Sequence, residues 1–229
     1  MYLIELQNTS ILEQLQLEEA LLRADDREWC IINTGSSPAI VMGISGQPER
    51  LLDTSLLKRD AIPVIKRYSG GGTVYIDEET IFVTFICNSK SQNVSPFPRS
   101  IMEWSENIYR PIFNHPEFAL RENDYVIGEK KFGGNAQYIQ KERWVHHTSF
   151  LWHFDPHKMR YLLLPEKRPS YRGNRSHKDF LCSLKDFHPE KSAFMKSLKT
   201  SLKLKFPLQA DWNSVLSRPH RKGTSLLTF

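Results

Sequence analysis

Three consecutive glycines follow closely after a pair of cations in the first third of the chain. The cations are Lys66 and Arg67, and the glycines are Gly70, Gly71 and Gly72. Because glycine has no Cβ atom, a ligand can lie against such a backbone and the N–H groups can turn toward an anion. The stretch indicates an anion-binding loop, although a hairpin turn alone would also explain the three glycines. No Gly-Lys-Ser/Thr follows and no helical pattern opens after it, so it is neither a P-loop nor a dinucleotide-binding fingerprint.

A second pair of glycines comes after two more lysines, in a run that is typical of a strand. Lys130 and Lys131 precede Gly133, Gly134 and the polar Asn135. Side chains alternate across a strand, so only one of the two lysines can face a ligand. A lysine ammonium is a compact charge that binds carboxylates and phosphates. The glycines either let a ligand approach the backbone closely or form a β-bulge, with Asn135 bonded to its own backbone.

Two adjacent histidines stand in a third such run. His146 and His147 are followed by the hydroxyl residues Thr148 and Ser149. Neighbouring strand residues point to opposite faces, so the two imidazoles cannot ligate one metal ion without distortion. We therefore predict no metal site. One histidine is expected to line a ligand site and the other to be packed or solvated.

The cysteines and the N-terminus bear on the compartment. Cys30, Cys87 and Cys182 are widely spaced and odd in number, which favours free thiols in a reducing compartment over a disulfide framework. The N-terminus has no basic region ahead of an apolar core, so it is not typical of a secretory signal. No apolar run approaches the roughly 20 residues that cross a bilayer. The sequence predicts a cytoplasmic protein that does not enter a membrane.

The charge balance indicates an anionic ligand or an acidic protein partner. The formal net charge is +5, from 31 Lys and Arg against 26 Asp and Glu, which is too weak to indicate nucleic acid by itself. Between residues 158 and 178 only Glu166 opposes a group of cations. That group consists of Lys158, Arg160, Lys167, Arg168, Arg172, Arg175 and Lys178. Such a run is usually solvated surface, but here it can also contact an anionic ligand or partner.

Strands and helices must bring these runs together. The predicted strands around them cover residues 62–66, 80–87, 130–136 and 144–152. A capping box of Ser10 and Glu13 opens a first predicted helix. The predicted helices cover residues 10–24, 100–113, 155–164 and 189–202. Since the strands cluster as hairpins more than as repeated βαβ units, we predict an α+β fold with a mixed, largely antiparallel sheet flanked by helices.

Three stretches of the sequence resemble lipoate–protein ligases. Residues 67–75 read Arg-Tyr-Ser-Gly-Gly-Gly-Thr-Val-Tyr, similar to the family's Arg-Arg-x-Ser-Gly-Gly-Gly-x-Val-Tyr-His-Asp element. Residues 128–137 read Gly-Glu-Lys-Lys-Phe-Gly-Gly-Asn-Ala-Gln and resemble its Gly-x-Lys-x-x-Gly-x-Ala segment. Residues 146–151 read His-His-Thr-Ser-Phe-Leu and resemble its His-His-Gly-Thr-Leu-Leu strand. The blocks come in the family's order within residues 39–184, and the resemblance implies the fold of the biotin and lipoate ligase catalytic domain.

The resemblance implies a two-step reaction on lipoate. The lipoate carboxylate attacks the α-phosphate of ATP, supplied with Mg²⁺, giving lipoyl-AMP and pyrophosphate. A lysine amine on an apo lipoyl carrier domain then attacks the acyl carbon and expels AMP. Both steps need positioning and positive charge where oxyanion charge builds up. The implied carriers are the lipoyl domains of 2-oxoacid dehydrogenase complexes or the glycine cleavage H protein, and the basic run can bind the adenylate or dock an acidic carrier.

The resemblance also implies which residues act. Lys131 matches the family's lysine and is the expected catalytic residue. The residues expected to bind substrate and adenylate are Arg67, Ser69, Gly70, Gly71, Gly72, Val74, Tyr75, Gly133, Gly134, Asn135, Ala136, His147 and Ser149. Val74 and Tyr75 can equally belong to the core. Thr148 replaces a glycine of the family and Ile76 replaces a histidine, so the role of that histidine is not carried over.

The length of the chain bears on its domains. We expect residues 1–185 to form a lipoate-ligase-like catalytic domain and residues 186–229 a C-terminal helix and tail packed on it. This leaves no room for the full accessory domain that many lipoate ligases append. Such a chain would work alone, with a separate accessory chain, or as a transferase from a preformed adenylate.

Two alternatives use different chemistry. Relatives of this fold move octanoyl or lipoyl groups through a cysteine thioester without ATP, which requires an activated thiol near the lysine. Cys182 follows the basic run and is the one candidate nucleophile, although a half-buried structural cysteine is the more ordinary interpretation. A nucleic-acid-binding protein that uses the basic run is a further alternative, but the cations are not interleaved with a stacking platform of aromatic residues.

Overall fold

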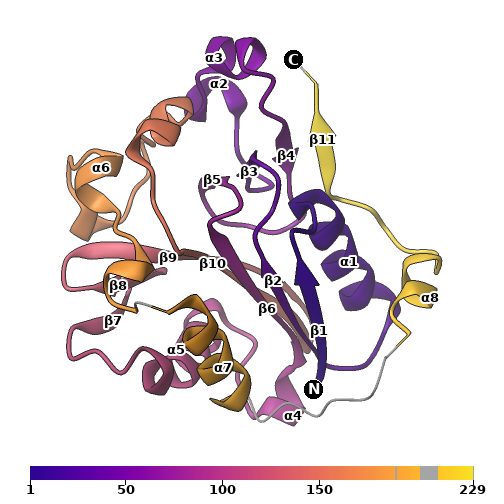
Figure 1. Cartoon of the computed structure of the whole chain (residues 1–229). Helices are drawn as coiled ribbons and strands as arrows, with labels where there is room; N and C mark the ends of the chain where they lie inside the picture. The colour runs from indigo at the N-terminus through magenta and orange to yellow at the C-terminus, as the bar shows by residue number, and fades with distance from the viewer. Residues whose placement is uncertain (189, 202–210, 229) are drawn as a thin grey trace.

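Two β-sheets form the framework of the protein (Figure 1). The computed structural model describes residues 1–188, 190–201 and 211–228. The larger sheet has the strand order β1-β2-β6-β10-β9-β8-β7, and the smaller sheet has the order β11-β4-β3-β5. Among the described strands, only the pairs β1–β2 and β3–β4 are parallel. The predicted α+β class with mixed, largely antiparallel pairing is confirmed.

Most of the strands belong to the larger sheet, and its central strands β6 and β10 are deeply buried. The strands of the larger sheet are β1 (Tyr2–Gln7), β2 (Trp29–Thr34), β6 (Thr80–Asn88), β7 (Phe118–Arg121), β8 (Asp124–Ile127), β9 (Lys130–Gln140) and β10 (Arg143–Leu151). Those of the smaller sheet are β3 (Ala39–Met42), β4 (Val64–Lys66), β5 (Thr73–Ile76) and β11 (Ser225–Leu227). Strands β6 and β10 are buried along almost their whole length, because both faces of the larger sheet are covered.

Helices cover the sheets from two sides. The α-helices are α1 (Ile11–Ala24), α2 (Pro48–Leu51), α3 (Thr54–Arg59), α4 (Ser89–Gln92), α5 (Pro98–Phe113), α6 (His177–Phe180), α7 (Lys191–Ser201) and α8 (Asn213–Leu216). Three 3₁₀ turns are η1 (Pro156–Tyr161), η2 (Ser170–Arg172) and η3 (Leu184–Asp186). Helix α1 begins as predicted, since the Ser10 hydroxyl accepts the Glu13 N–H at 3.3 Å and donates to the Glu13 carboxylate at 2.8 Å.

The two faces of the larger sheet have separate cores. Helices α5 and α7 pack on one face over an aromatic cluster, in which the Phe113 and Phe132 rings lie 4.9 Å apart and the Tyr109 and Phe150 rings 5.1 Å apart. Helix α1 packs on the other face. The smaller sheet also packs on that side, where Phe82 of β6 joins Val41 and Ile65. Figure 1 shows this smaller sheet and α1 on the side opposite α5 and α7.

Several elements differ from the sequence prediction. Strands β1 and β7 were not predicted; both lie at the edges of the larger sheet, where pairing with one neighbour decides the structure. Helix α5 begins at Pro98 instead of residue 100, because proline fits the first helical position. Asp155 caps its turn by accepting the His157 N–H at 2.9 Å, but the element is a six-residue 3₁₀ helix rather than a helix to residue 164.

The last predicted helix corresponds to α7. Residues 189 and 202, where this helix was predicted to start and end, lie outside the described residues. In the described part of the chain, no helix is long and apolar enough to span a bilayer.

Candidate active site

A β-bulge in β9 determines which of its residues point to each face of the larger sheet. Val126 of β8 pairs with Lys131, whereas Tyr125 pairs with Gly133, so Phe132 is the extra residue on β9. The bulge changes the alternation of side chains. Phe132 points into the aromatic core, and a Cβ on Gly133 would lie 3.0 Å from the Phe150 ring.

The same bulge places Lys131 and Gly134 on the other face of the sheet. A Cβ on Gly134 would lie 3.2 Å from Lys131 Nζ and 3.7 Å from the Ser149 hydroxyl. Lys130 is exposed. The absence of a side chain at Gly134 therefore makes room for the end of the Lys131 side chain.

Lys131 is held by a carboxylate from the neighbouring strand. Its Nζ lies 2.7 Å from Asp124 Oδ1, with 20% of the lysine side chain and 7% of the aspartate side chain exposed. The other oxygen of Asp124 accepts the Tyr171 hydroxyl at 2.8 Å. Burial and the Asp124 charge raise the pKa of Tyr171, so the phenol stays protonated and donates. Sequence reasoning missed Asp124 and Tyr171, because they meet Lys131 only through strand pairing and a distant turn.

The glycine loop, residues 67–72, lies against β9. The Gly70 N–H donates to the Gln137 carbonyl at 3.1 Å, and a Cβ on Gly71 would lie 3.4 Å from the Ala136 Cβ. Gly71 has a φ of +117°, which only glycine adopts without strain. On its other side the loop touches Gly43, where a Cβ would come within 2.2 Å of the Gly71 carbonyl oxygen.

Arg67 organises the loop from within. Its Nη2 donates to the Gly70 carbonyl at 3.0 Å and to the Gly72 carbonyl at 2.9 Å. Burial lowers the pKa of Arg67 to about 10, so the guanidinium remains charged at neutral pH. Its Nε is buried and has no hydrogen-bond partner among the described residues. The sequence assigned Arg67 to a substrate anion, whereas the structure places two of its hydrogen bonds on the loop itself.

His147 faces the same side as Lys131 and is fixed by a buried carboxylate. Its Nδ1 lies 2.9 Å from Glu18 Oε1, and Glu18 also accepts the Thr84 hydroxyl at 2.7 Å and the Gln14 amide at 2.8 Å. Because a carboxylate only accepts, Nδ1 carries the proton toward Glu18. Sequence reasoning missed Glu18; the signal is its position on the buried face of α1, four residues after Gln14.

One expected ligand-binding residue, Asn135, lies on the other face of the sheet. Asn135 belongs to the α5 side of the sheet, where Thr148 donates to its Oδ1 at 2.7 Å. His146 lies on that side too, 3.0 Å from the Gln137 amide, and burial together with the charge of His147 lowers its pKa to about 3. Asn135 therefore faces away from Lys131, and the two adjacent histidines face opposite sides.

Some of the other residues expected to bind substrate lie in the glycine loop or near Lys131, and others belong to the core. Ser69 is buried, and its carbonyl accepts the Ile44 N–H at 3.0 Å. Ser149 lies beside Gly134, with its hydroxyl 3.5 Å from the Gly134 carbonyl. Val74 packs with the cluster between the two sheets, and Tyr75 stacks on Tyr161 at 5.8 Å. The alternative interpretation of Val74 and Tyr75 as core residues describes where they lie.

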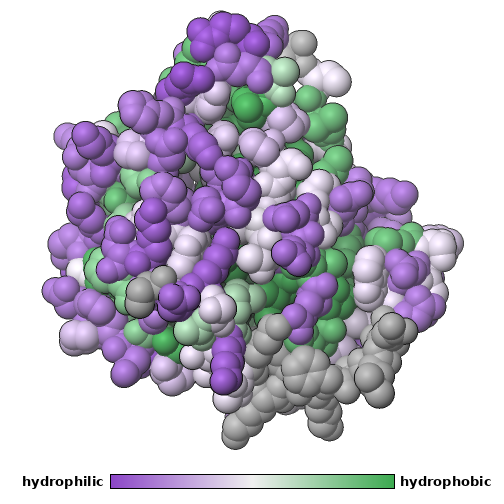
Figure 2. Space-filling model, in the orientation of Figure 1, coloured by the Kyte–Doolittle hydropathy of each residue, from purple (hydrophilic) through white to green (hydrophobic). Residues whose placement is uncertain are grey.

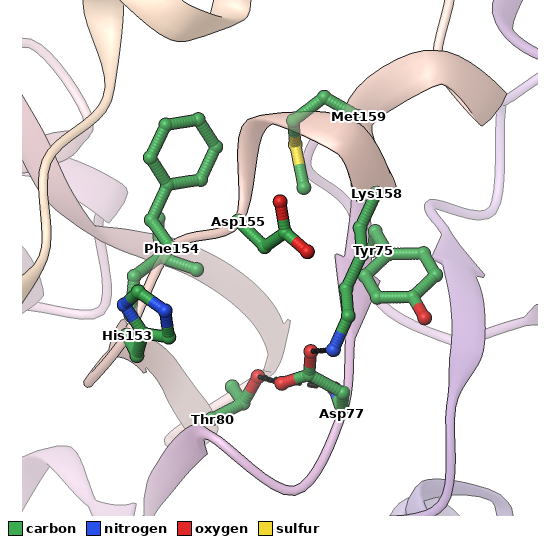
Figure 3. A pocket seen from close by; sticks show the side chains of 9 residues that line it. Tyr75, Asp77, Thr80, His153, Phe154, Asp155, Lys158 and Met159 are labelled. Carbon is green, nitrogen blue, oxygen red and sulfur yellow. Dashed lines mark hydrogen bonds and ion pairs between the residues drawn. The ribbon is translucent and has the colours of Figure 1, made fainter.

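A small pocket opens at the far end of β5 from the glycine loop (Figure 3). Its lining consists of Tyr75, Asp77, Thr80, Leu151, His153, Phe154, Asp155, Lys158 and Met159. Lys158 Nζ points to Asp77 and lies 2.6 Å from its Oδ2, as Figure 3 shows. In the described residues no group of three or more His, Cys, Asp or Glu side chains could hold a metal ion.

Cys182 contacts the backbone of Lys130 and Lys131. Its N–H donates to the Lys131 carbonyl at 2.9 Å, and its Sγ lies 3.7 Å from that oxygen and 3.8 Å from the Lys130 carbonyl. Burial raises the pKa of its thiol to about 11. The thiol therefore stays protonated and faces backbone carbonyls.

The basic run is only partly solvated. Lys158 pairs with Asp77, and Arg160 lies 2.7 Å from Asp60, so acidic residues distant in sequence oppose cations that seemed unopposed. Arg172 is buried over the Phe180 ring at 4.7 Å, and its Nη2 has no partner among the described residues. Lys167 and Lys178 remain exposed. Figure 2 shows hydrophilic side chains over this side of the molecule, around α6.

Known proteins resemble this chain in sequence and in fold. Residues 10–206 match the family model of the lipoyl protein ligase A/B catalytic domain. The inactive lipoate–protein ligase 2 of Plasmodium falciparum is 30% identical over 245 residues, which cover 81% of this chain and 63% of that protein. A mitochondrial lipoyl amidotransferase of Homo sapiens is 30% identical over 146 residues, which cover 62% of this chain and 36% of that protein. The chain thus spans less than two thirds of these relatives.

Solved structures show the same fold. A lipoate-protein ligase A bound with ATP superposes with a TM-score of 0.71 and 18% identity, covering 94% of this chain and 91% of that chain. A bi-partite lipoate protein ligase from Thermoplasma acidophilum superposes with a TM-score of 0.72 and 20% identity, covering 94% and 89%. The fold implied by the sequence resemblance is confirmed.

Proposed function

Because the chain belongs to the lipoyl protein ligase A/B catalytic-domain family, we propose that it is an ATP-dependent lipoate–protein ligase. In this proposal it joins lipoate to AMP with release of pyrophosphate, and then transfers the lipoyl group to a lysine of an apo lipoyl carrier domain. The observation that carries the proposal is the position of Lys131. Its ammonium lies beside Gly134 and Ser149, on the sheet face that also carries Ala136, against which the glycine loop packs.

Lys131 supplies positive charge at the reacting groups. In the first step the lipoate carboxylate and the α-phosphate carry like charges and must approach each other. An ammonium between them lowers that repulsion and stabilises charge on the phosphoryl oxygens. In the second step it stabilises the oxyanion that forms when the carrier amine attacks the acyl carbon and AMP leaves. Asp124 would hold Lys131 in place while the substrates enter.

The glycine loop is proposed to bind lipoate and the phosphates. Its Gly70 N–H bonds to the Gln137 carbonyl of β9, and Gly71 lies against Ala136 of the same strand. Arg67 fixes two of its carbonyls. The Nε of Arg67 and the Nη2 of Arg172, which have no hydrogen-bond partner within the described part of the chain, are guanidinium donors that suit an anionic ligand. Ser69, Gly72, Ala136, His147 and Ser149 complete the proposed walls, while Gly133, Asn135, Val74 and Tyr75 would act from behind them.

ATP and lipoate are the proposed substrates, and Mg²⁺ is proposed to arrive with the nucleotide. Magnesium usually binds nucleotide sites through the phosphates with only one or two protein carboxylates. A site without a three-ligand cluster in the described residues suits such a metal. The ATP-bound ligase of the same fold supports the nucleotide as substrate.

The proposed partners are lipoyl carrier domains of 2-oxoacid dehydrogenase complexes or the glycine cleavage H protein. The exposed cations Lys167 and Lys178 lie before and after η2 in the sequence, whose Tyr171 contacts Asp124, and they would attract an acidic carrier. The Thermoplasma protein, a bi-partite ligase solved with an E2 lipoyl domain, supports a carrier of this kind and a separate accessory chain. We propose that residues 1–185 form the catalytic domain with residues 186–229 packed on it, acting in the cytoplasm.

A thioester route through Cys182 is the second candidate, because the human relative is an amidotransferase. A nucleophilic cysteine needs a thiolate. Burial and the raised pKa of Cys182, and its position behind Lys131, argue against that route. The lysine route is therefore favoured.

The test is the intact mass of an apo lipoyl domain after incubation with this protein and one of three donors: lipoate with Mg-ATP, preformed lipoyl-AMP, or octanoyl carrier protein. Modification with lipoate and Mg-ATP, lost in Lys131→Ala and kept in Cys182→Ala, is the expected result. Modification from lipoyl-AMP alone would restrict the protein to the transfer step. Modification from octanoyl carrier protein alone, lost in Cys182→Ala, would overturn the proposal.

A further inference from the structure

A buried carboxylate on α1 ties the end of the described chain to the glycine loop. Glu19 is 1% exposed. Its two oxygens accept the Gly223 N–H at 2.9 Å each, and its Oε2 accepts the Thr224 N–H at 3.0 Å. Arg23 supplies the charge partner at 2.9 Å. A buried carboxylate is costly unless its oxygens are hydrogen-bonded, so Glu19 and residues 223–224 stabilise one another.

Residues 223–227, here called the strap, then continue onto the strand that enters the glycine loop. Ser225, Leu226 and Leu227 form β11 and pair with Lys66, Ile65 and Val64 of β4. Lys66 immediately precedes Arg67. Figure 1 shows β11 lying along β4, with α8 beside α1. The strap therefore covers the edge of the smaller sheet at the point where the chain turns into the loop.

The strap also packs on the first aromatic residue of the loop. A Cβ on Gly223 would lie 3.0 Å from the Tyr68 Cβ and 3.1 Å from Glu19 Oε1, so a larger residue at this position would have to displace these neighbours. Tyr68 is 1% exposed, and the Arg23 guanidinium lies 5.7 Å from its ring. Tyr68 is held from both sides, and its neighbour Arg67 holds the Gly70 and Gly72 carbonyls.

We propose that Glu19 is a positioning residue, which acts through the strap to keep the glycine loop in the conformation that binds lipoate. The inference rests on the proposed ligase function for its catalytic consequence only. The path runs from Glu19 to Gly223 and Thr224, through β11 and Tyr68 to Arg67, and from Arg67 to the loop carbonyls. Glu19 itself touches no reacting atom.

The first test is hydrogen exchange of the full chain, which does not depend on activity. Glu19→Ala removes the acceptor, Glu19→Gln retains one acceptor oxygen, and Thr224→Pro removes a donor from the strap. Amides of residues 66–72 are expected to exchange at least about tenfold faster in Glu19→Ala and Thr224→Pro, with a smaller increase in Glu19→Gln. Amides of β6 and β10 should exchange as in the wild type. Glu103→Ala, which removes another Arg–Glu pair four residues apart at an exposed site, is the matched control.

The second test separates positioning from loss of fold. With lipoate and Mg-ATP, Glu19→Ala is expected to raise the KM for lipoate about tenfold while kcat changes much less, because the loop binds the ground state. If the wild type modifies no carrier domain, the proposed function is overturned, and hydrogen exchange alone then decides whether the strap proposal holds. Unchanged exchange of residues 66–72, or an equal increase in β6 and β10, would overturn the strap proposal.

Discussion

The two faces of the β9–β10 strand pair differ in what they contain and in how they are held. On the α5 side lie aromatic rings and a polar group formed by the buried His146 and Thr148 and the half-buried Asn135, whose hydrogen bonds are made with one another and with their neighbours. On the other side lie Lys131 and His147, each fixed by a buried carboxylate from a different element. Adjacent residues of the same strands thus serve packing on one face and charge on the other.

Substitutions on the two faces should therefore have different effects, on stability at one face and on activity at the other. The α5 face makes a continuous apolar core, so lost volume there weakens folding. The opposite face contains the fixed charges of Lys131 and His147 and the glycine loop, so changes there should alter binding and catalysis while the fold persists. Each prediction below tests one side of this division.

The largest stability effect is expected on the α5 face. Phe150→Ala removes a buried ring that lies 5.1 Å from Tyr109 and 6.0 Å from Phe132, and we expect it to lower the free energy of unfolding by about 3–5 kcal/mol. Ser149→Ala, one residue away on the other face, is the matched control and should cost less than about 1 kcal/mol. Urea denaturation measures both. Equal losses would remove the proposed distinction between the faces.

On the charged face, Asp124→Ala should slow catalysis by about a hundredfold, because it releases the end of Lys131 from a defined position. Asp124→Asn loses the charge and one of the two acceptor oxygens but keeps the other, which can still accept from Lys131, so an intermediate loss is expected. The measurement is the rate of lipoyl-AMP formation, with thermal unfolding as the control for folding. A wild-type rate in Asp124→Ala would show that Lys131 needs no carboxylate.

The glycine loop should respond to a change outside it. Gly43→Ala places a Cβ where the Gly71 carbonyl now lies, so the loop backbone must shift, and we expect about a tenfold rise in the KM for lipoate. Gly72→Ala meets no atom within 4 Å, and a much smaller change is expected. If the two variants behave alike, close contact between Gly43 and the loop has no role in substrate binding.

Stability should fall in mild acid because of His146. Its pKa is about 3 in the folded protein and about 6.5 when the chain is unfolded. Between these values the unfolded state binds a proton that the folded state does not, so stability decreases as the pH falls from about 6.5 toward 3, by up to about 1.4 kcal/mol per pH unit. His146→Gln should reduce this slope in urea titrations at several pH values. An unchanged slope would place the titrating group elsewhere.

Local sequence signals predicted some elements well. The Ser10 capping box, the opposite orientation of the two histidines and the glycine-rich loop all arise from neighbours in the chain. The bulge at Phe132 was only one of two alternatives, because a strand run of sequence does not reveal which residue lacks a partner. For the same reason Asn135 was expected at the ligand but lies on the other face.

The partners of the charged residues could not be predicted. Glu18 and Tyr171 are distant in sequence from the side chains they contact, whereas Asp124 lies on the strand next to Lys131 and meets it only through the pairing of β8 with β9. The strap was missed because residues 223–227 have no periodic pattern; pairing with β4 makes them a strand. Val215, in the same part of the chain, is buried in the hydrophobic cluster that also contains Tyr68.

The central claim is that Lys131 supplies the charge for lipoate activation. The most direct measurement is single-turnover formation of lipoyl-AMP from lipoate and Mg-ATP by the wild type, Lys131→Ala and Lys130→Ala, with matched thermal unfolding. We expect Lys131→Ala to lose at least about a thousandfold in rate without unfolding, and the exposed neighbour Lys130→Ala to retain the wild-type rate. Wild-type adenylate formation by a folded Lys131→Ala protein would contradict the account.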